Sequence, residues 1–161
     1  FQCLTGLRYS ELELVNKRII TSNFCLFLKE NKDTSKPERE IPLYKLALEI
    51  LKKYDYQLPL TTNQEQNRAI KRIVRKVGLI HEVEYYRNKG VEQERIIKVF
   101  CDRITTHTAR RTFVTILRHE GVADKNIMSM TGHRDIKTFN TYHQVNSSAN
   151  MDAVNRVFGS L

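Results

Sequence analysis

The sequence has few of the features that define secreted, membrane and metal-dependent proteins. Its three cysteines are far apart and odd in number, which suits neither a disulfide framework nor a zinc site and favours a reducing compartment. No apolar run approaches the roughly 20 residues that a membrane-spanning helix needs, and no signal peptide is visible. The His, Cys and Asp residues lack ligand spacing, and no compact set of carboxylates could hold two metal ions. We therefore expect no metal, no cofactor and no membrane contact.

Positive charge is what the sequence has in excess. It contains 27 Lys and Arg against 18 Asp and Glu, a net charge of +9, and 40% hydrophobic residues, enough for a core. The segment from Glu65 to Arg118 holds 13 basic and 6 acidic residues and so carries most of the surplus. Such a surplus favours a polyanion, most often a nucleic acid, because phosphate contacts release counterions. On charge alone, a soluble basic protein without such a partner remains an equal alternative.

The first third of the chain predicts a helix and a β-hairpin. Apolar residues at helical spacing predict a helix over 5–19. Two runs rich in strand-forming residues, 23–29 and 39–43, predict antiparallel strands joined by the polar loop 30–38. Pro42 places the second strand at a sheet edge, because proline cannot donate a ladder hydrogen bond.

The rest of the chain is mainly helical in pattern. Further helices are expected over 44–54, 63–78, 107–121, 123–132, 135–145 and 147–161. Their expected core-facing residues include Leu46, Ile50, Leu51, Phe113, Ile116 and Leu117. Asn63 is expected to cap its helix, and the alternating residues 81–100 predict a second hairpin. The sum is an α+β class, a mainly helical domain with a small antiparallel β-sheet.

Two stretches early and midway in the chain carry polar residues that a core does not require. In "TGLRYSEL", Arg8 follows a turn glycine and Glu11 lies three residues later. In "HTARR", His107 and Arg110 are one helical turn apart and so share a face. Alone, the first pair reads as a surface ion pair of about 0.3–0.5 kcal/mol, and the second is short enough to occur by chance.

A third stretch, "TGHRDIKTFNTYH", lies near the end of the chain. His133 is at a turn, and Tyr142 follows nine positions later on the next expected helix. A helical tyrosine is usually a core residue, so this motif is not decisive alone either.

Together, and in this order, the three stretches resemble the tyrosine recombinases, also called the phage-integrase family. The family pattern is an arginine in TGLR.SEL, then His-x-x-Arg, then Gly-His, then a tyrosine at the spacing seen here. The stretch "HTARRTF" most resembles the branch carried by conjugative transposons and other mobile elements. The resemblance implies that residues 1–161 form the catalytic domain of the DNA breaking–rejoining fold. Because the chain begins at Phe1, we expect a fragment whose N-terminal core-binding domain lies upstream.

The resemblance also implies a chemistry. Transesterification at a DNA phosphodiester passes through a phosphorane with extra negative charge, and losing one fixed donor to it commonly costs on the order of 10²–10³ in rate. Arginine grips two oxygens and stays charged. By resemblance, Arg8 and Arg110 form the clamp, Glu11 orients Arg8, and His107 and His133 complete it through hydrogen bonds and proton transfer.

Tyr142 is the nucleophile that the resemblance implies, with a 3′-phosphotyrosine link and a free 5′-hydroxyl. A phenol with a pKa near 10 is weak at neutral pH, so it needs a base or a positive field. The family also uses a lysine in the hairpin after the first motif, to protonate the leaving oxygen. The loop offers Lys29, Lys32 and Lys36. Lys32 is favoured because "ENKDT" best resembles the family's stretch.

Double-stranded DNA is the expected partner. A basic helix face and one residue beside Arg110 would contact its phosphates, through Arg68, Lys71, Arg72, Arg75 and Arg111; a solvated face is the alternative. The resemblance implies a homotetramer on paired DNA sites, integration of a mobile element, and a place in the bacterial cytoplasm with the nucleoid. The rival hypothesis is a non-catalytic helix-turn-helix DNA-binding protein, since residues 121–145 fit that module.

Overall fold

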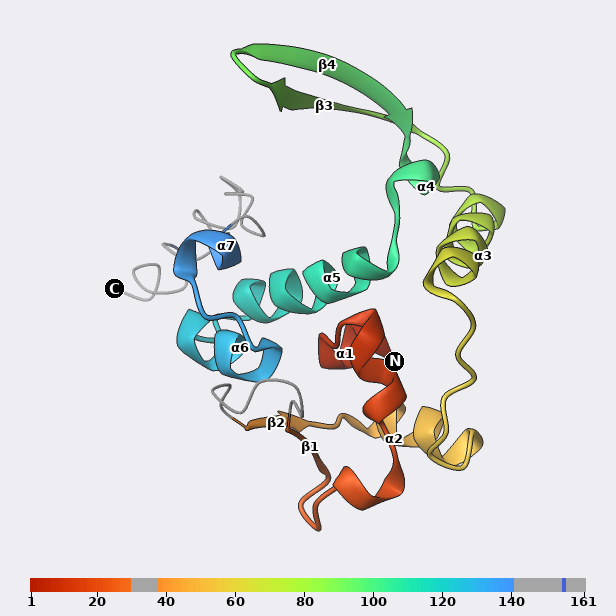
Figure 1. Cartoon of the computed structure of the whole chain (residues 1–161), viewed down its shortest axis with the longest axis vertical. Helices are drawn as coiled ribbons and strands as arrows, with labels where there is room; N and C mark the ends of the chain where they lie inside the picture. The colour runs from red at the N-terminus through yellow and green to blue at the C-terminus, as the bar shows by residue number, and fades with distance from the viewer. Residues whose placement is uncertain (30–37, 141–154, 156–161) are drawn as a thin grey trace.

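Short helices and two β-hairpins make up the fold, as predicted (Figure 1). The computed structural model describes residues 1–29, 38–140 and 155. In chain order, the elements are α1 (Gln2–Thr5), the 3₁₀ helices η1 (Tyr9–Leu14) and η2 (Lys17–Ile19), β1 (Cys25–Leu28), β2 (Arg39–Pro42), α2 (Lys45–Lys53), α3 (Asn63–Lys76), β3 (Glu82–Lys89), β4 (Glu92–Val99), α4 (Phe100–Arg103), α5 (Thr106–His119), α6 (Asp124–Thr131) and α7 (Ile136–Asn140). Among these elements the strands form two separate two-stranded sheets rather than one.

The predicted helix over 5–19 is three short pieces. Gly6 has a left-handed φ of 66° and ends α1, and the chain then continues as η1 and η2. Asn16 is extended, and its side chain accepts a hydrogen bond from the backbone N–H of Arg18, which starts η2 separately. The prediction of one helix was therefore wrong, although the apolar positions Leu7 and Leu12 are buried as their spacing indicated.

The β1–β2 hairpin confirms the two predicted strands. They pair antiparallel, with Cys25 opposite Pro42 and Leu28 opposite Arg39. Within this two-stranded sheet, Pro42 lies on an edge strand, as expected. Alternation along β2 buries Ile41 and, on the same face, the charged Arg39.

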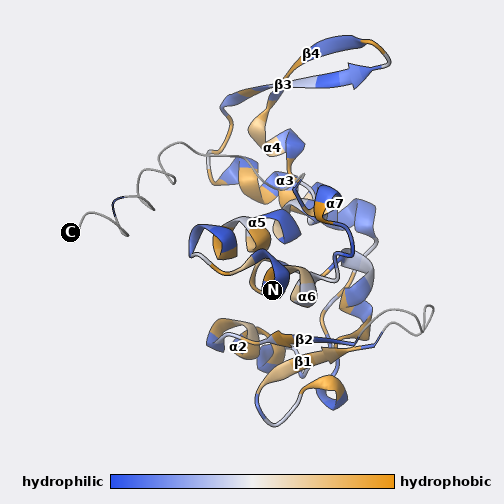
Figure 2. Cartoon of the chain, turned by 90° about the vertical axis from the view of Figure 1, so that its left-hand side faces the viewer, coloured by the Kyte–Doolittle hydropathy of each residue, from blue (hydrophilic) through white to orange (hydrophobic). Residues whose placement is uncertain are grey.

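The main core joins the N-terminal segment, the first hairpin and α2. It is built from Leu7, Leu12, Val15, Leu26, Leu28, Ile41, Leu43, Ala47 and Leu51. Figure 2 shows hydrophobic residues of this core along β1, β2 and α2. A second, smaller cluster of Val114, Ile127 and Phe139 ties α5, α6 and α7 together. Helix α1 packs against α5, which links the two parts.

Two expected core positions face outward instead. Leu46 is 48% exposed because α2 turns Ala47 and Leu51, one helical turn apart, towards the core. Ile116 is 52% exposed for the same reason: α5 buries Phe113 and Val114. Apolar content predicted both helices correctly. When a helix carries apolar residues on more than one side, however, the sequence alone does not show which side faces the core.

Helix α3 is capped by Thr62 rather than by Asn63. The Thr62 side chain accepts a hydrogen bond from the backbone N–H of Glu65, and the Glu65 carboxylate accepts one from the backbone N–H of Thr62. Asn63 instead contacts the start of α5: its Oδ1 accepts a hydrogen bond from Thr106 Oγ1 over 3.0 Å. Asn67 Oδ1 accepts a second one from the Thr106 backbone N–H over 2.8 Å. These contacts attach α3 to the start of α5.

The second predicted hairpin is confirmed and stands apart from the rest. Strands β3 and β4 pair antiparallel over their whole length, from Glu82 opposite Val99 to Lys89 opposite Glu92. They arch away from the helices; β3 follows α3, and β4 leads into α4 (Figure 1). Across the described ranges, no helix is both long and apolar enough to cross a bilayer.

Candidate active site

Arg110 lies at the centre of the candidate site. It is only 1% exposed. It lies about one turn into α5, on the same face of that helix as His107. Its Nη1 donates to the carbonyl oxygen of Gly6 over 2.7 Å, and its Nη2 donates to the carbonyl oxygen of Thr131. The guanidinium therefore joins the end of α1 to the end of α6.

Glu11 holds Arg8 in place. Its carboxylate accepts hydrogen bonds from the backbone N–H of Arg8 and from Arg8 Nη1, each over 2.7 Å. Glu11 is 5% exposed, whereas the side chain of Arg8 is 40% exposed. The ordinary alternative of a surface ion pair is therefore excluded for Glu11, although the Arg8 guanidinium reaches solvent.

A residue that the sequence analysis did not single out also binds Glu11. Arg39 on β2 is 4% exposed, and its Nη2 donates to Glu11 Oε1 over 2.5 Å. Arg110 Nη1 lies 4.0 Å from Glu11 Oε2. Burial raises the pKa of Glu11, but the charge of Arg39 and the hydrogen bond from Arg8 outweigh it, so the pKa lies below its usual value. Glu11 is therefore an anion among three guanidiniums.

His133 follows the left-handed Gly132 (φ 69°) that ends α6. Its Nε2 lies 3.4 Å from Arg110 Nη2, and its ring packs against Phe139 with centroids 5.2 Å apart. Burial, and then the charges of Arg110 and Arg8, lower its pKa from 6.5 to about 4. The imidazole is therefore neutral at physiological pH.

Thr131 determines which nitrogen of His133 carries the proton. The Thr131 hydroxyl donates its single proton to the carbonyl oxygen of Ile127 over 2.6 Å. The 2.7 Å contact between Thr131 Oγ1 and His133 Nδ1 must then have Nδ1 as the donor. Nε2 consequently carries the lone pair; Arg110 Nη2, which lies 3.5 Å from Nδ1 and 3.4 Å from Nε2, does not distinguish the two nitrogens.

His107 lies in the first turn of α5, and its side chain is exposed. Burial of part of the ring, followed by the charges of Arg110, Arg111 and Arg8, lowers the pKa of His107. His107 also lowers the pKa of His133. The structure thus brings together Arg8, His107, Arg110 and His133, four of the six residues predicted to be catalytic.

The other two predicted catalytic residues, Lys32 and Tyr142, lie outside the described residues, as does the alternative lysine Lys36. The third lysine candidate, Lys29, follows β1 and pairs with Glu38 over 3.1 Å with a side chain that is 65% exposed.

Sequence signals existed for the residues that were missed. Strand alternation places Arg39 on the same face as the buried Ile41, so an inward-facing arginine could have been identified from β2 alone. Thr131 gave no comparable signal, because a threonine two positions before a histidine is unremarkable.

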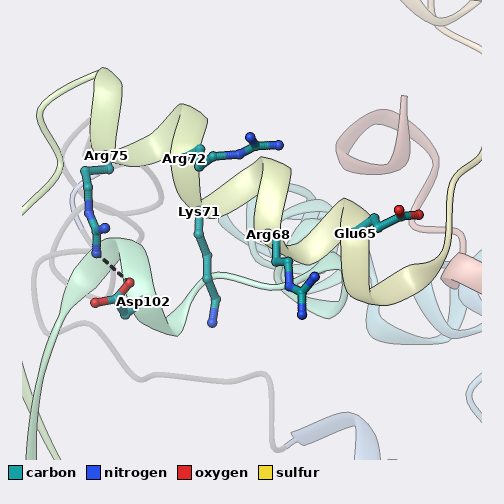
Figure 3. Close-up of a pocket in the computed structure, with 6 residues that line it drawn as sticks. All are labelled: Glu65, Arg68, Lys71, Arg72, Arg75 and Asp102. Atoms are coloured by element: carbon teal, nitrogen blue, oxygen red, sulfur yellow. Dashed lines mark hydrogen bonds and ion pairs between the residues drawn. The ribbon is translucent and has the colours of Figure 1, made fainter.

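A basic surface lies on α3, at some distance along the chain from these residues. Arg68, Lys71, Arg72 and Arg75 line a pocket with Glu65 and with Asp102 of α4. Figure 3 shows Arg68, Lys71 and Arg75 extending towards the same side of the helix, whereas Arg72 points elsewhere. Arg75 is bound to Asp102 over 2.8 Å, so part of its charge is compensated.

Arg111, the fifth predicted DNA contact, is not part of that surface. It is exposed on α5 and acts on the pKa of His107, which places its charge beside the candidate active site. Within the described ranges, no group of three or more His, Cys, Asp or Glu residues is arranged to hold a metal ion.

Comparison with known proteins identifies the family. Residues 1–149 match the phage integrase family, so the chain belongs to that family. The tyrosine recombinase XerD of Staphylococcus saprophyticus is 31% identical over 152 residues, covering 89% of this chain and 48% of that protein. A tyrosine recombinase of Thermosipho africanus is 28% identical over 156 residues, covering 94% of this chain and 50% of that protein. The chain thus spans about half the length of these curated relatives.

Solved structures share the fold. The crystal structure of XerA recombinase superposes with a TM-score of 0.69 at 18% identity, covering 97% of this chain and 55% of that one. An integrase of the Tn1549 transposon, in complex with circular intermediate DNA, gives a TM-score of 0.61 at 16% identity, covering 95% of this chain and 54% of that one. These matches confirm the mainly helical fold of a tyrosine recombinase catalytic domain.

Proposed function

We propose that this chain is the catalytic domain of a site-specific tyrosine recombinase that cleaves and rejoins DNA through a 3′-phosphotyrosine intermediate. The observation that carries the proposal is the convergence of Arg8, His107, Arg110 and His133 from separate segments of the chain. Membership of the phage integrase family supports the same activity.

The charges in the cluster suit a phosphate. Three guanidiniums, those of Arg8, Arg39 and Arg110, surround the single carboxylate of Glu11, so positive charge is in excess. Burial, and then the charges of Arg110 and Arg8, lower the pKa of His133, so the imidazole stays neutral within this positive cluster. A phosphodiester that gains negative charge in its transition state would be stabilised by fixed cations of this kind.

The same field would activate the nucleophile. We assign that role to Tyr142, because positive charge nearby favours the phenolate and lowers the pKa of a phenol. Lys32 is the proposed general acid that protonates the leaving 5′-oxygen. His133 is neutral at neutral pH, so with its lone pair on Nε2 it is suited to accept a hydrogen bond in the site.

Double-stranded DNA is the proposed substrate. The integrase of Tn1549 and the XerH recombinase were both solved with DNA, and their fold is that of this chain. Arg68, Lys71 and Arg72 on α3 and Arg111 on α5 are the proposed phosphate contacts. We further propose a core-binding domain in the other half of the protein, a homotetramer on paired sites, mobile-element integration, and action on the bacterial nucleoid in the cytoplasm.

A nicked-duplex capture experiment tests the activity. A pool of nicked duplexes, randomised in sequence around the nick, is incubated with the protein and resolved on a denaturing gel. Loss of the short fragment beyond the nick traps the covalent intermediate, so the wild-type protein should yield a denaturation-resistant protein–DNA band. Sequencing the trapped DNA then identifies the cleavage site.

Two tyrosine variants make that experiment specific. Tyr142→Phe should abolish the covalent band, whereas Tyr44→Phe, an exposed tyrosine before α2, should leave it unchanged. A protein that shifts duplex DNA on a native gel without forming any covalent band would instead support the helix-turn-helix alternative, which does not need the convergence of the four residues.

A further inference from the structure

Arg39 is a second buried guanidinium within the cluster. It lies on β2, far in the sequence from the three recognised motifs, and is 4% exposed. Its Nη2 donates to Glu11 Oε1 over 2.5 Å, and its Nη1 donates to the carbonyl oxygen of Met130 over 3.4 Å. One side chain therefore connects η1, which carries Glu11, with the last turn of α6.

Arg39 also lies against the turn that presents His133. A Cβ atom built on Gly132 would lie 2.9 Å from Cδ and 3.1 Å from Cζ of Arg39, so the arginine packs directly on the glycine backbone. Gly132 has a φ of 69° and turns the chain from α6 to His133. The position of the imidazole consequently depends on the side chain beneath this turn.

We propose that Arg39 is a positioning residue of the phosphate site, acting through Glu11 on Arg8 and through the Gly132 turn on His133. This inference rests on the proposed recombinase activity. It extends that activity to a residue outside the motifs by which the chain was recognised.

Electrostatics explain why an arginine is suited to this position. Glu11 is 5% exposed and needs cationic partners. With Arg39 bound to Oε1, Arg8 shares the same carboxylate, and Arg110 remains 4.0 Å from Oε2. Without Arg39, the carboxylate would be compensated by Arg8 and Arg110 alone. Their charge would then be directed at Glu11 instead of at a phosphate.

The competing interpretation is a purely structural ion pair. Arg118 provides a matched control, because it forms such a pair within the same domain. Its Nε and Nη2 donate to Asp124 over 2.7 and 2.8 Å, its side chain is 11% exposed, and it joins α5 to α6. Arg118 also stacks on Phe139, which packs against His133, and donates to Asn140 over 3.0 Å. Loss of Arg118 should therefore weaken the fold and disturb the phosphate site less than loss of Arg39, which binds Glu11 directly.

The test compares Arg39→Met, Arg39→Lys and Arg118→Met in the intact protein. The measurements are the single-turnover rate of covalent adduct formation at saturating DNA, the Kd for the same DNA, and the Tm. For Arg39→Met we expect a rate lower by about 10²-fold, because a small misplacement of reacting groups commonly has an effect of that size. Its Kd should stay within about twofold of wild type, since DNA affinity derives mainly from other phosphate contacts.

The two other variants separate positioning from stability. Arg39→Lys should recover part of the rate, because lysine keeps the charge beside Glu11 but lacks the planar fork that also reaches Met130. Arg118→Met should lower the Tm and lower the rate much less than Arg39→Met does, because it reaches His133 only through Phe139. A wild-type rate in Arg39→Met, or equal loss of rate in Arg39→Met and Arg118→Met, overturns the proposal.

The remaining outcomes are also decisive. If Arg39→Met does not fold, Arg39→Lys provides the test of the proposal. A wild-type rate in that variant would show that the planar guanidinium of Arg39 is not needed to position the site. If the wild-type protein forms no covalent adduct, the recombinase proposal fails and this inference fails with it. If the wild-type protein forms the adduct and the Arg39 variants form it at the wild-type rate, the positioning role of Arg39 is rejected, whereas the recombinase proposal stands.

Discussion

Arg110 Nη1 donates a hydrogen bond over 2.7 Å to the carbonyl oxygen of Gly6, 104 positions earlier in the chain. Its Nη2 binds a second carbonyl, that of Thr131. Carbonyl groups are neutral, so they fix the guanidinium without cancelling its charge, while Glu11 Oε2 stays 4.0 Å away. The geometry therefore holds a buried cation in one orientation and keeps its charge for an anion.

Arg110→Lys is expected to impair both the chemistry and the fold. A lysine cannot span the two carbonyls, and each unsatisfied buried group typically costs about 1–3 kcal/mol. Covalent adduct formation should fall by about 10²–10³-fold, the usual loss for one transition-state donor. Single-turnover kinetics and urea unfolding measure the two effects. Arg111 is an exposed neighbour, so Arg111→Lys should change the free energy of unfolding by less than about 0.5 kcal/mol. If Arg111→Lys destabilised the protein as much as Arg110→Lys, the two buried carbonyl contacts would not explain the effect.

Gly6→Ala is expected to destabilise the protein more than Gly121→Ala. Both glycines have a positive φ, 66° and 79°, so each alanine should cost about 1–2 kcal/mol in backbone strain. At Gly6 the new Cβ would also lie 2.5 Å from Phe113 Cδ1, whereas at Gly121 it would meet nothing within 4 Å. Urea unfolding of both variants measures the difference, and Phe113→Leu should recover part of the loss at Gly6. Equal losses at the two glycines would refute the steric explanation.

His133 is expected to make the protein less stable in mild acid. Its folded-state pKa of about 4 lies below the usual value of 6.5. Between these two pH values the unfolded chain binds a proton that the folded chain does not, so stability falls as the pH drops through this window. An NMR titration should place the His133 ring near pH 4, and Arg8→Gln should raise that value by removing a nearby charge. His133→Asn should flatten the pH dependence of urea unfolding between pH 6.5 and 4.

Thr131→Val is expected to disturb the tautomer of His133. Valine keeps the shape of the side chain but lacks the hydroxyl that accepts from Nδ1–H. Nitrogen-15 NMR of the imidazole should show mainly Nδ1–H in wild type and a mixture of tautomers in the variant. Because a small misplacement of a group at the reacting centre can cost about 10²-fold in rate, the rate of adduct formation should fall. An unchanged tautomer would show that Arg110, rather than Thr131, fixes the ring.

The basic surface of α3 is expected to set the salt dependence of DNA binding. Each lost phosphate contact should reduce the slope of log K against log salt by about 0.9. Lys71→Ala should show this reduction, while Arg75→Ala should show less, because Asp102 already compensates part of the Arg75 charge. Fluorescence anisotropy at several salt concentrations measures the slope. Lys45→Ala on α2, with a side chain that is 84% exposed, is the control and should leave the slope unchanged.

Much of the fold could be predicted because local patterns determine it. Alternation indicated β1, β2, β3 and β4, and helical spacing indicated α2, α3, α5 and α6 with boundaries close to those observed. The first helix was wrong because Gly6 takes a left-handed conformation and Asn16 starts a separate turn. Both effects depend on single residues, which a spacing rule spread over fifteen positions does not resolve.

The sequence predicted the motif residues of the candidate site, but it did not predict the groups that hold those residues in place. Arg8, His107, Arg110 and His133 form recognisable motifs, and the structure brings them together. The supporting partners are carbonyl groups and side chains that carry no motif: the carbonyl of Gly6, the hydroxyl of Thr131 and the guanidinium of Arg39. Such contacts join segments far apart in the chain, so they become visible only in three dimensions.

Because Gly6 and Thr131 both anchor Arg110, a polypeptide still emerging from the ribosome cannot complete this anchor. Until residue 131 has left the exit tunnel, the guanidinium has only one of its two carbonyl partners. Translation order therefore delays assembly of the cluster until residue 131 has been synthesised and can reach Arg110.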